Sequence, residues 1–157
     1  MNPPVKHARI VGSLVMLGFG SIGQAMLPLL FRHLEIESRQ LKIISADEDN
    51  TGIAAEFGVE FTVQTLTEGN YEAVLEGYVT DGDFLLNLSV DVSSLALMRF
   101  CWLRGALYLD TCIEPWAGRY RLRDKALGCE RAHLADQDDL ERSCSHPAGG
   151  RTNQGYR

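Results

Sequence analysis

Three glycines with the spacing Gly-x-Gly-x-x-Gly stand early in the chain, at Gly18, Gly20 and Gly23. The apolar residues 15–17 precede them, and a segment with helical spacing follows. In that context the first glycine permits a tight turn, the second lets a pyrophosphate approach the backbone, and the third lets the helix pack closely on the strand. The spacing therefore predicts a dinucleotide-binding turn, and a glycine-rich turn without a ligand is the alternative.

The start of the predicted helix adds a second binding element. Ser21 and Ile22 open this segment, which continues to residue 34. The first N–H groups of a helix have no partner within it, and they carry a partial positive charge that attracts phosphate. We therefore predict that Ser21 and Ile22 bind the cofactor together with the three glycines.

An acidic turn follows the second predicted strand, which covers residues 41–44. A carboxylate about 20 residues beyond such a glycine turn holds the adenosine ribose. Asp47 is the first candidate and Asp49 the second, and the alternative for both is a solvated turn carboxylate. No Arg or Lys stands between this strand and Arg99. A 2′-phosphate would meet carboxylates here, so the sequence favours NAD over NADP.

Polar residues also follow the fourth and fifth predicted strands, in the segments 87–94 and 110–116. In open parallel sheets, ligands bind beyond the carboxyl ends of the strands. We predict that Asn87 and Ser89 hydrogen-bond the cofactor. The alternative is that they only satisfy polar groups of their own loop.

Two carboxylates in these segments could face one crevice, with an aromatic ring beside them. Asp91 follows the fourth strand, and Glu114 and Trp116 follow the fifth. Carboxylates next to an aromatic face suit an ammonium group, through Coulomb attraction and cation–π contact. Two alternatives stay open: Asp91 could only cap the next helix, and Glu114 could only pair with Arg119.

The elements that position these residues alternate regularly between strand and helix. Such alternation predicts an α/β fold over residues 1–120, a Rossmann-like doubly wound parallel sheet with helices on both faces. The expected strands are 10–17 (with its most apolar part at 15–17), 41–44, 59–63, 84–88 and 106–109, and the expected helices are 22–34, 51–57, 67–79 and 93–105.

Composition narrows the range of partners. The chain has 157 residues and a formal net charge of -6, which argues against a nucleic-acid partner. No apolar run is long enough to cross a bilayer, so we expect no membrane partner. The four cysteines stand at no metal-ligand spacing, and we expect reduced thiols, no metal site and a cytoplasmic location.

The last part of the chain, residues 121–157, differs from what precedes it. Charged and small polar residues dominate there, and apolar periodicity is almost absent. Such a segment does not predict a packed element. At most, residues 132–142 could form a solvated helix, so we treat 121–157 as an irregular polar tail.

Three segments resemble the bacterial homospermidine synthases, which belong to the saccharopine dehydrogenase-like group. They are residues 16–24 (M-L-G-F-G-S-I-G-Q), 87–94 (N-L-S-V-D-V-S-S) and 107–116 (L-Y-L-D-T-C-I-E-P-W). The resemblance extends over residues 15–120, most of that family's N-terminal cofactor domain. It implies NAD as cofactor and ammonium-binding roles for Asp91 and Glu114.

The resemblance also implies a reaction. NAD accepts a hydride from putrescine, a second putrescine forms a Schiff base as ammonia leaves, and return of the hydride gives homospermidine. Spermidine serves as an aminobutyl donor in related enzymes. Two alternatives stay open: an inactive NAD-binding fragment, and another saccharopine dehydrogenase-like oxidoreductase, against which the E-P-W segment argues.

The sequence departs from that family in two ways. Where the acidic residue should end the second strand, the chain has Ser45, and Asp47 comes two positions later. The resemblance also implies a second, larger domain that completes the substrate pocket and a homodimer, and this sequence does not contain one. We therefore expect a truncated or frameshifted product whose isolated chain is inactive.

Overall fold

A five-stranded parallel sheet forms the centre of the protein, which a computed structural model describes over residues 5–119. The strand order is β5-β4-β2-β6-β7, so the chain starts in the middle of the sheet and builds outward in both directions. This order confirms the predicted doubly wound fold. The strands are β2 (Leu14–Leu17), β4 (Leu41–Ser45), β5 (Glu60–Val63), β6 (Phe84–Asn87) and β7 (Leu107–Asp110).

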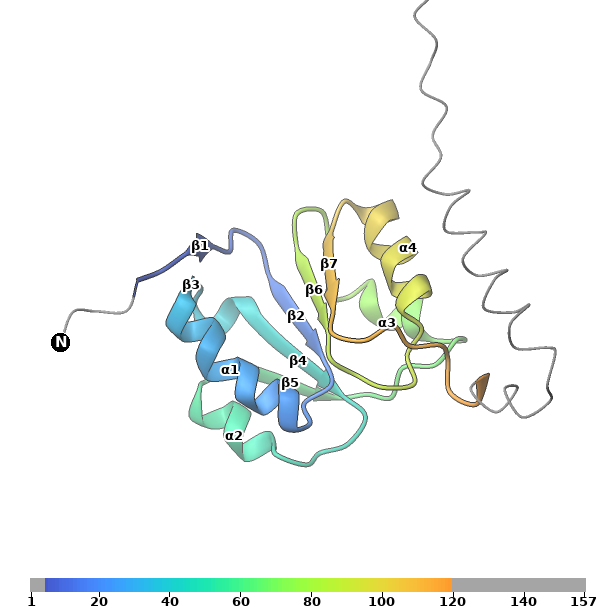
Figure 1. The fold of residues 1–157 in the computed structure, drawn as a ribbon, viewed down its shortest axis with the longest axis horizontal. Helices are drawn as coiled ribbons and strands as arrows, with labels where there is room; N and C mark the ends of the chain where they lie inside the picture. Colours follow the sequence, from blue (N-terminus) through green and yellow to red (C-terminus); the bar gives the residue numbers. More distant parts are fainter. Residues whose placement is uncertain (1–4, 120–157) are drawn as a thin grey trace, which may run out of the picture. The chain divides into compact units, whose positions relative to one another are not determined.

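Within residues 5–119, four α-helices cover the two faces of this sheet (Figure 1). They are α1 (Ser21–His33), α2 (Thr51–Glu56), α3 (Tyr71–Leu75) and α4 (Ser94–Arg104). Figure 1 shows α1 and α2 on one side of the strands and α3 and α4 on the other. The four residues of β2 are all buried, and alternate ones belong to the two apolar clusters that lie on opposite faces of the sheet.

Helix α1 turns a different face inward from the one its apolar spacing suggests. Ile22 and Leu29 are exposed, whereas Gly23, Leu27 and Leu30 are buried. A glycine brings two backbones closer than any other residue can, so the helix packs with Gly23 against the strand end. The exposure of Ile22 is therefore a consequence of the glycine turn.

Helix α3 is shorter than expected. The spacing predicts a helix over residues 67–79, but α3 ends at Leu75 and the chain then forms turns. Apolar residues on both sides of that end pack into the same cluster, among them Leu75 and Val79. Burial of an apolar face therefore extends beyond the helix itself, and this is why the pattern overestimates its length.

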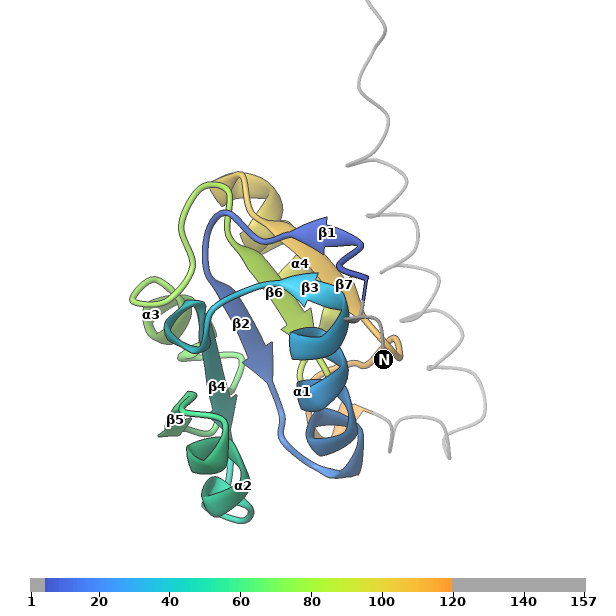
Figure 2. The ribbon, with the colours of Figure 1, turned by 90° about the vertical axis from the view of Figure 1, so that its left-hand side faces the viewer.

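The N-terminal arm forms a second, smaller parallel pair that the sequence pattern does not predict. β1 (Ala8–Arg9) pairs with β3 (Leu34–Glu35), as Figure 2 shows beyond the end of α1. Of the strand expected over residues 10–17, only the second half, Leu14–Leu17, therefore belongs to the main sheet. Two-residue strands are too short to produce a periodic pattern, and none could be identified from the spacing.

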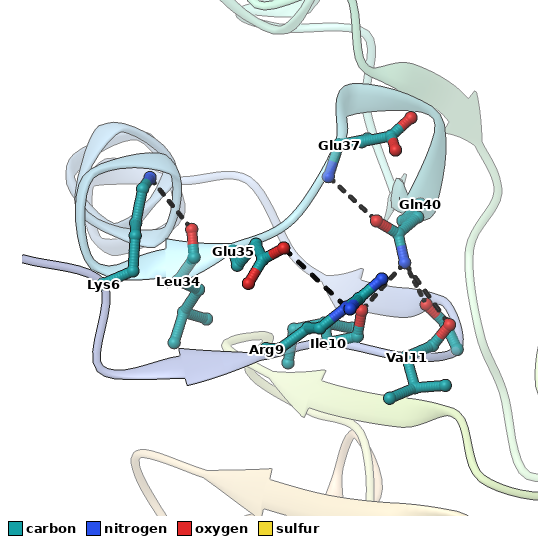
Figure 3. A network of polar contacts seen from close by, with 9 residues as sticks. Lys6, Arg9, Ile10, Val11, Leu34, Glu35, Glu37 and Gln40 are labelled. Carbon is teal, nitrogen blue, oxygen red and sulfur yellow. Dashed lines mark hydrogen bonds and ion pairs between the residues drawn. The ribbon is translucent and has the colours of Figure 1, made fainter.

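Gln40, the last residue of the 3-10 helix η1 (Ser38–Gln40), holds the arm in place (Figure 3). Its Nε2 donates to the carbonyl oxygens of Ile10 and Gly12, each at 3.0 Å. Its Oε1 accepts from the N–H of Glu37 at 2.9 Å. One amide side chain thus satisfies backbone groups of both the arm and the 3-10 helix.

Asp83 joins the amino ends of β2 and β6. Its carboxylate is buried and accepts hydrogen bonds from the N–H of Ser13 at 2.6 Å and from the N–H and hydroxyl of Thr80, both at 2.8 Å. A buried carboxylate that accepts three hydrogen bonds supports the turn and both strand starts at once.

Replacing Asp83 with alanine should therefore lower the free energy of unfolding by about 2–3 kcal/mol, because two N–H groups lose their acceptor. Urea denaturation of the purified chain measures the change. The matched control is Asp81→Ala, in the same turn but exposed, which should change stability by less than about 0.5 kcal/mol. Equal losses in the two variants would contradict the role given to Asp83.

Candidate functional site

The glycine turn leaves β2 at its carboxyl end and is fixed to both neighbouring strands. The N–H of Gly18 donates to the carbonyl of Ile44 at 2.8 Å, and Gly18 has a φ of +81°. A Cβ on Gly18 would lie 2.8 Å from the Cα of Ser89, in the loop after β6. Both the backbone angle and the lack of space require glycine, as the predicted tight turn demands.

Gly23 and Gly20 differ sharply in what surrounds them. A Cβ on Gly23 would lie 2.8 Å from the carbonyl oxygen of Gly18, which explains a glycine where helix meets strand. A Cβ on Gly20 would meet nothing within 4 Å, and Gly20 is exposed with a φ of -71°. The fold therefore requires no glycine at position 20, and the open space lies where the motif places a pyrophosphate.

The N-terminus of α1 is suited to an anion. Gly20 is its N-cap residue, no side chain caps it, and its first turn contains no acidic residue. Ser21 and Ile22 are both exposed at this end. Because the leading N–H groups of a helix carry a partial positive charge, a phosphate would be stabilised here.

The acidic turn begins beside the glycine turn, since Leu17 of β2 pairs with Ile44 of β4. Ser45 ends β4 and is buried, whereas Asp47 and Asp49 are exposed. The carboxylate of Asp47 accepts from the N–H of Asp49 at 3.2 Å. Asp47 thus shapes the turn and leaves its negative charge at the surface, an arrangement compatible with a ribose hydroxyl.

Asn87 lies in the interior rather than in an open site. Its side chain is buried, and its Oδ1 accepts from the N–H of Ser89 at 3.2 Å and from the hydroxyl of Ser89 at 2.5 Å. Its Nδ2 donates to the hydroxyl of Tyr108 at 3.3 Å. In the described structure the amide of Asn87 thus bonds to protein groups and holds Ser89, and its expected hydrogen bond to the cofactor stays a prediction.

The loops after β6 and β7, which carry the two candidate carboxylates, are joined by hydrogen bonds. The N–H of Ala117 donates to the carbonyl of Asp91 at 2.9 Å, and the N–H of Ser94 donates to the carbonyl of Glu114 at 2.8 Å. The hydroxyl of Ser94 accepts from the N–H of Glu114 at 3.0 Å. The structure thus brings the Asp91 and Glu114 segments together, as their positions on neighbouring strands predict.

Asp91 does not cap the helix that follows it, and Arg119, the partner considered for Glu114, forms an ion pair with another residue. The cap of α4 is Ser93, whose side chain accepts from the N–H of Ala96. Arg119 pairs with Glu68 at 2.8 Å. Asp91 is exposed and has a φ of +62°, an uncommon backbone angle that Asp and Asn tolerate better than most residues.

Trp116 packs into the interior of the protein. It is buried at 8% exposure within the apolar cluster beneath α3 and α4, and its ring lies 5.2 Å from that of Tyr71. Because the ring packs against core residues, it anchors the loop that carries Glu114. The expected contact of this ring with an ammonium group stays a prediction.

Tyr108 and Ser94 belong to the site although the sequence pattern did not single them out. Burial raises the pKa of Tyr108 well above its usual range, while hydrogen bonds with Asn87 and Ser94 lower it and Asp110 raises it. Tyr108 and Asp110 are two residues apart in β7 and therefore share a face of the sheet. In the register of β6 and β7, Asp110 pairs with Asn87. This spacing is the signal that could have identified Tyr108.

Cys112, also in the loop after β7, is exposed. A hydrogen bond with Glu114 and the nearby negative charges raise the pKa of its thiol. A raised pKa disfavours the thiolate, so the geometry argues against a nucleophilic cysteine. Within residues 5–119, no cluster of three or more His, Cys, Asp or Glu side chains could hold a metal ion.

A doubly wound parallel sheet with a glycine turn and an uncapped helix at the carboxyl end of its central strand defines a dinucleotide-binding domain. Residues 14–139 match the family described as the saccharopine dehydrogenase NADP binding domain. The chain belongs to that family. In the part that the structure describes, no helix is long and apolar enough to span a membrane.

Known proteins similar to the chain are homospermidine synthases. That of Mesorhizobium japonicum is 36% identical in an alignment of 154 residues that covers 96% of the chain and 31% of the relative. That of Blastochloris viridis is 44% identical over 120 residues, 74% of the chain and 25% of the relative. The chain thus spans less than a third of either relative, and both the first alignment and the family match extend past residue 120.

A solved structure is similar in both fold and sequence. It is the homospermidine synthase from Legionella pneumophila in complex with NAD, with a TM-score of 0.68 and 38% identity. The match covers 78% of this chain and 27% of that one. The predicted resemblance to the bacterial homospermidine synthases is confirmed by these three relatives.

The different surroundings of Gly18 and Gly20 predict different stability effects. Gly18→Ala should lower the free energy of unfolding by about 2 kcal/mol or more, because alanine there combines a positive φ with a backbone clash. Gly20→Ala should cost less than about 1 kcal/mol, the scale of a changed N-cap residue. Urea denaturation compares the two, and an equally large loss in Gly20→Ala would show that the fold itself requires that glycine.

Proposed function

We propose that the chain is the NAD-binding part of a homospermidine synthase. The observation that carries the proposal is its 38% identity to a homospermidine synthase solved in complex with NAD, over a stretch that includes most of the described fold. The motif residues supply an independent physical reason, because the glycine turn and α1 meet at the carboxyl end of β2 as a dinucleotide requires.

The described residues fit NAD in three respects. The space above Gly20 is open, the N-terminus of α1 is uncapped, and the acidic turn after β4 starts beside the glycine turn. In this proposal Gly18, Gly20, Ser21, Ile22 and Gly23 surround the pyrophosphate. Asp47 accepts hydrogen bonds from the adenosine ribose, and Ser89 lies toward the nicotinamide end, held there by Asn87.

The charge of the acidic turn favours NAD over NADP, although the family's own description specifies NADP. Asp47, Glu48 and Asp49 are all exposed there. A 2′-phosphate beside three carboxylates would be repelled, whereas a ribose hydroxyl can donate to one of them.

The substrate proposal rests on Asp91 and Glu114. Their loops are joined by hydrogen bonds at the same end of the sheet as the glycine turn, and carboxylates attract ammonium groups. We assign to them the ammonium groups of putrescine or spermidine, the substrates that the resemblance implies. Bound NAD would supply reversible hydride acceptance, and the two carboxylates would hold the amine in place for it.

A second candidate is a binding module that holds NAD without performing chemistry. This candidate concerns the 157 residues taken by themselves, which span 31% and 25% of the two relatives. Catalysis requires reactants to be positioned and water excluded, and most of a relative's chain lies outside the matched region. The homodimer expected for the full-length family members stays a prediction.

NAD binding is the first test. Isothermal titration calorimetry of the 157-residue chain should show NAD binding at least about tenfold tighter than NADP, since a 2′-phosphate would meet the acidic turn. Gly20→Ala should weaken NAD binding about tenfold or more, because its methyl group fills the space proposed for the pyrophosphate.

The control for this variant is its own unfolding curve, which should stay close to that of the wild type. Absence of NAD binding by the wild-type chain would refute the proposed function. Equal affinity for NAD and NADP would refute the role of the acidic turn alone.

Incubation with NAD and putrescine is the second test, with homospermidine measured by mass spectrometry and putrescine binding by NMR titration. We expect putrescine to bind the NAD-loaded chain without product formation, because the chain corresponds to less than a third of a homospermidine synthase. Product would exclude the binding-module candidate. Failure of putrescine to bind would contradict the polyamine assignment.

A matched pair of variants identifies the carboxylate involved. Asp91→Asn removes the charge but keeps the side-chain size and the tolerance of a positive φ. It should weaken putrescine binding, while Asp81→Asn, an exposed carboxylate in the turn between α3 and β6, should leave it unchanged.

A further inference from the structure

A chain of buried and half-buried polar groups connects β6 to β7 at the carboxyl ends of the strands, where the glycine turn also lies. The hydroxyl of Tyr108 donates to Oδ2 of Asp110 at 3.0 Å, and the Nδ2 of Asn87 donates to the hydroxyl of Tyr108 at 3.3 Å. One phenol thus joins groups of β6 and β7.

The direction of these hydrogen bonds is determined by their chemistry. An ionised carboxylate only accepts, so Tyr108 must donate to Asp110 and its oxygen is left to accept from the amide of Asn87. The other end of that amide, Oδ1, then faces Ser89 and accepts from both its N–H and its hydroxyl. Burial raises the pKa of Tyr108, which keeps the phenol protonated and this order intact.

Ser89 is the point where this chain of bonds reaches the glycine turn. Its Cα and N would lie 2.8 and 2.9 Å from a Cβ on Gly18, so the two backbones are in close contact. A displacement of Ser89 toward the turn would therefore shift Gly18 and with it the start of α1. The amide of Asn87 sets where Ser89 lies.

Ser94, the first residue of α4, binds the neighbouring loop that carries Glu114. Its hydroxyl donates to the carbonyl of Cys112 at 3.3 Å and accepts from the N–H of Glu114 at 3.0 Å. Among residues 5–119, every fully buried side-chain nitrogen or oxygen has a hydrogen-bond partner. Removal of one group from the network therefore leaves its partner without a hydrogen bond.

We propose that Tyr108 is a positioning residue of the nucleotide site, which acts through Asn87 on Ser89 and the glycine turn without touching the ligand. The inference rests on the proposed NAD binding and adds to it a residue that no glycine motif contains.

Tyr108→Phe removes that hydroxyl and keeps the ring that packs against the core. We expect the Kd for NAD, measured by calorimetry well below the melting temperature, to rise about fivefold, the scale of one lost hydrogen bond. The matched control is Tyr78→Phe. Its hydroxyl bonds to the side chain of Thr62 in β5 at 3.1 Å, and the Kd of this variant should stay within about twofold of the wild type.

A double-mutant cycle separates positioning from a general loss of stability. If Tyr108 acts through Asn87, Tyr108→Phe should have almost no further effect on the Kd in an Asn87→Ala background. A merely structural role would lower the affinity by the same factor in both backgrounds. In ¹⁵N-labelled protein without NAD, the amide signals of Gly18 and Ser89 should shift in Tyr108→Phe and not in Tyr78→Phe.

The outcomes are distinct. Failure of the wild-type chain to bind NAD refutes the proposed function, and the role of Tyr108 with it. Normal binding by the wild type with an unchanged Kd in Tyr108→Phe refutes the positioning role alone, as does an equal loss in Tyr78→Phe. If Tyr108→Phe does not fold, Asn87→Ala cuts the same connection at its other end, and an unchanged Kd in that variant overturns the inference.

Discussion

The close contact between the backbones of Gly18 and Ser89 is the constraint on which the site depends. β2 and β6 are paired in register, with Leu17 opposite Asn87, so the turns that leave the two strands start side by side. Only a glycine at position 18 lets them approach as they do. The direction of α1, the exposure of its N-terminus and the position of Ser89 all follow from this one contact, because each is attached to one of the two turns.

The proposed site would hold both the pyrophosphate of NAD and the ammonium groups of an amine within a protein of net charge -6. In the fold, the groups that attract anions and the groups that attract cations lie at different places. Backbone N–H groups and the dipole of α1 act at the glycine turn, where the first helical turn contains no acidic side chain. The carboxylates lie to either side, after β4 and after β6 and β7. In the proposed function, phosphate, ribose and ammonium groups would therefore meet neighbouring but electrostatically different parts of the site at the carboxyl ends of the strands.

Much of the fold and part of the site could be predicted from the sequence, for identifiable reasons. Continuous apolar runs and regular alternation predict the strands of the main sheet and its parallel, doubly wound arrangement, whereas the β1–β3 pair is too short to leave a pattern. The positions of Asp91 and Glu114 after neighbouring strands predict that their loops lie together, as they do. The sequence does not predict the burial of Asn87 and Trp116, because burial of a side chain beyond a strand depends on which distant residues pack over it, here Tyr108 and Tyr71.

The three glycines show how a structural requirement can be distinguished from a functional one. Gly18 and Gly23 are explained entirely by backbone angle and close packing, so their presence says only that this turn folds as it does. Gly20 has an ordinary φ, an open surrounding and a place at the N-cap, where Ser or Asp would stabilise the helix better. A residue that the fold does not need, at a position where the fold would prefer another, is the part of the motif that points to a ligand.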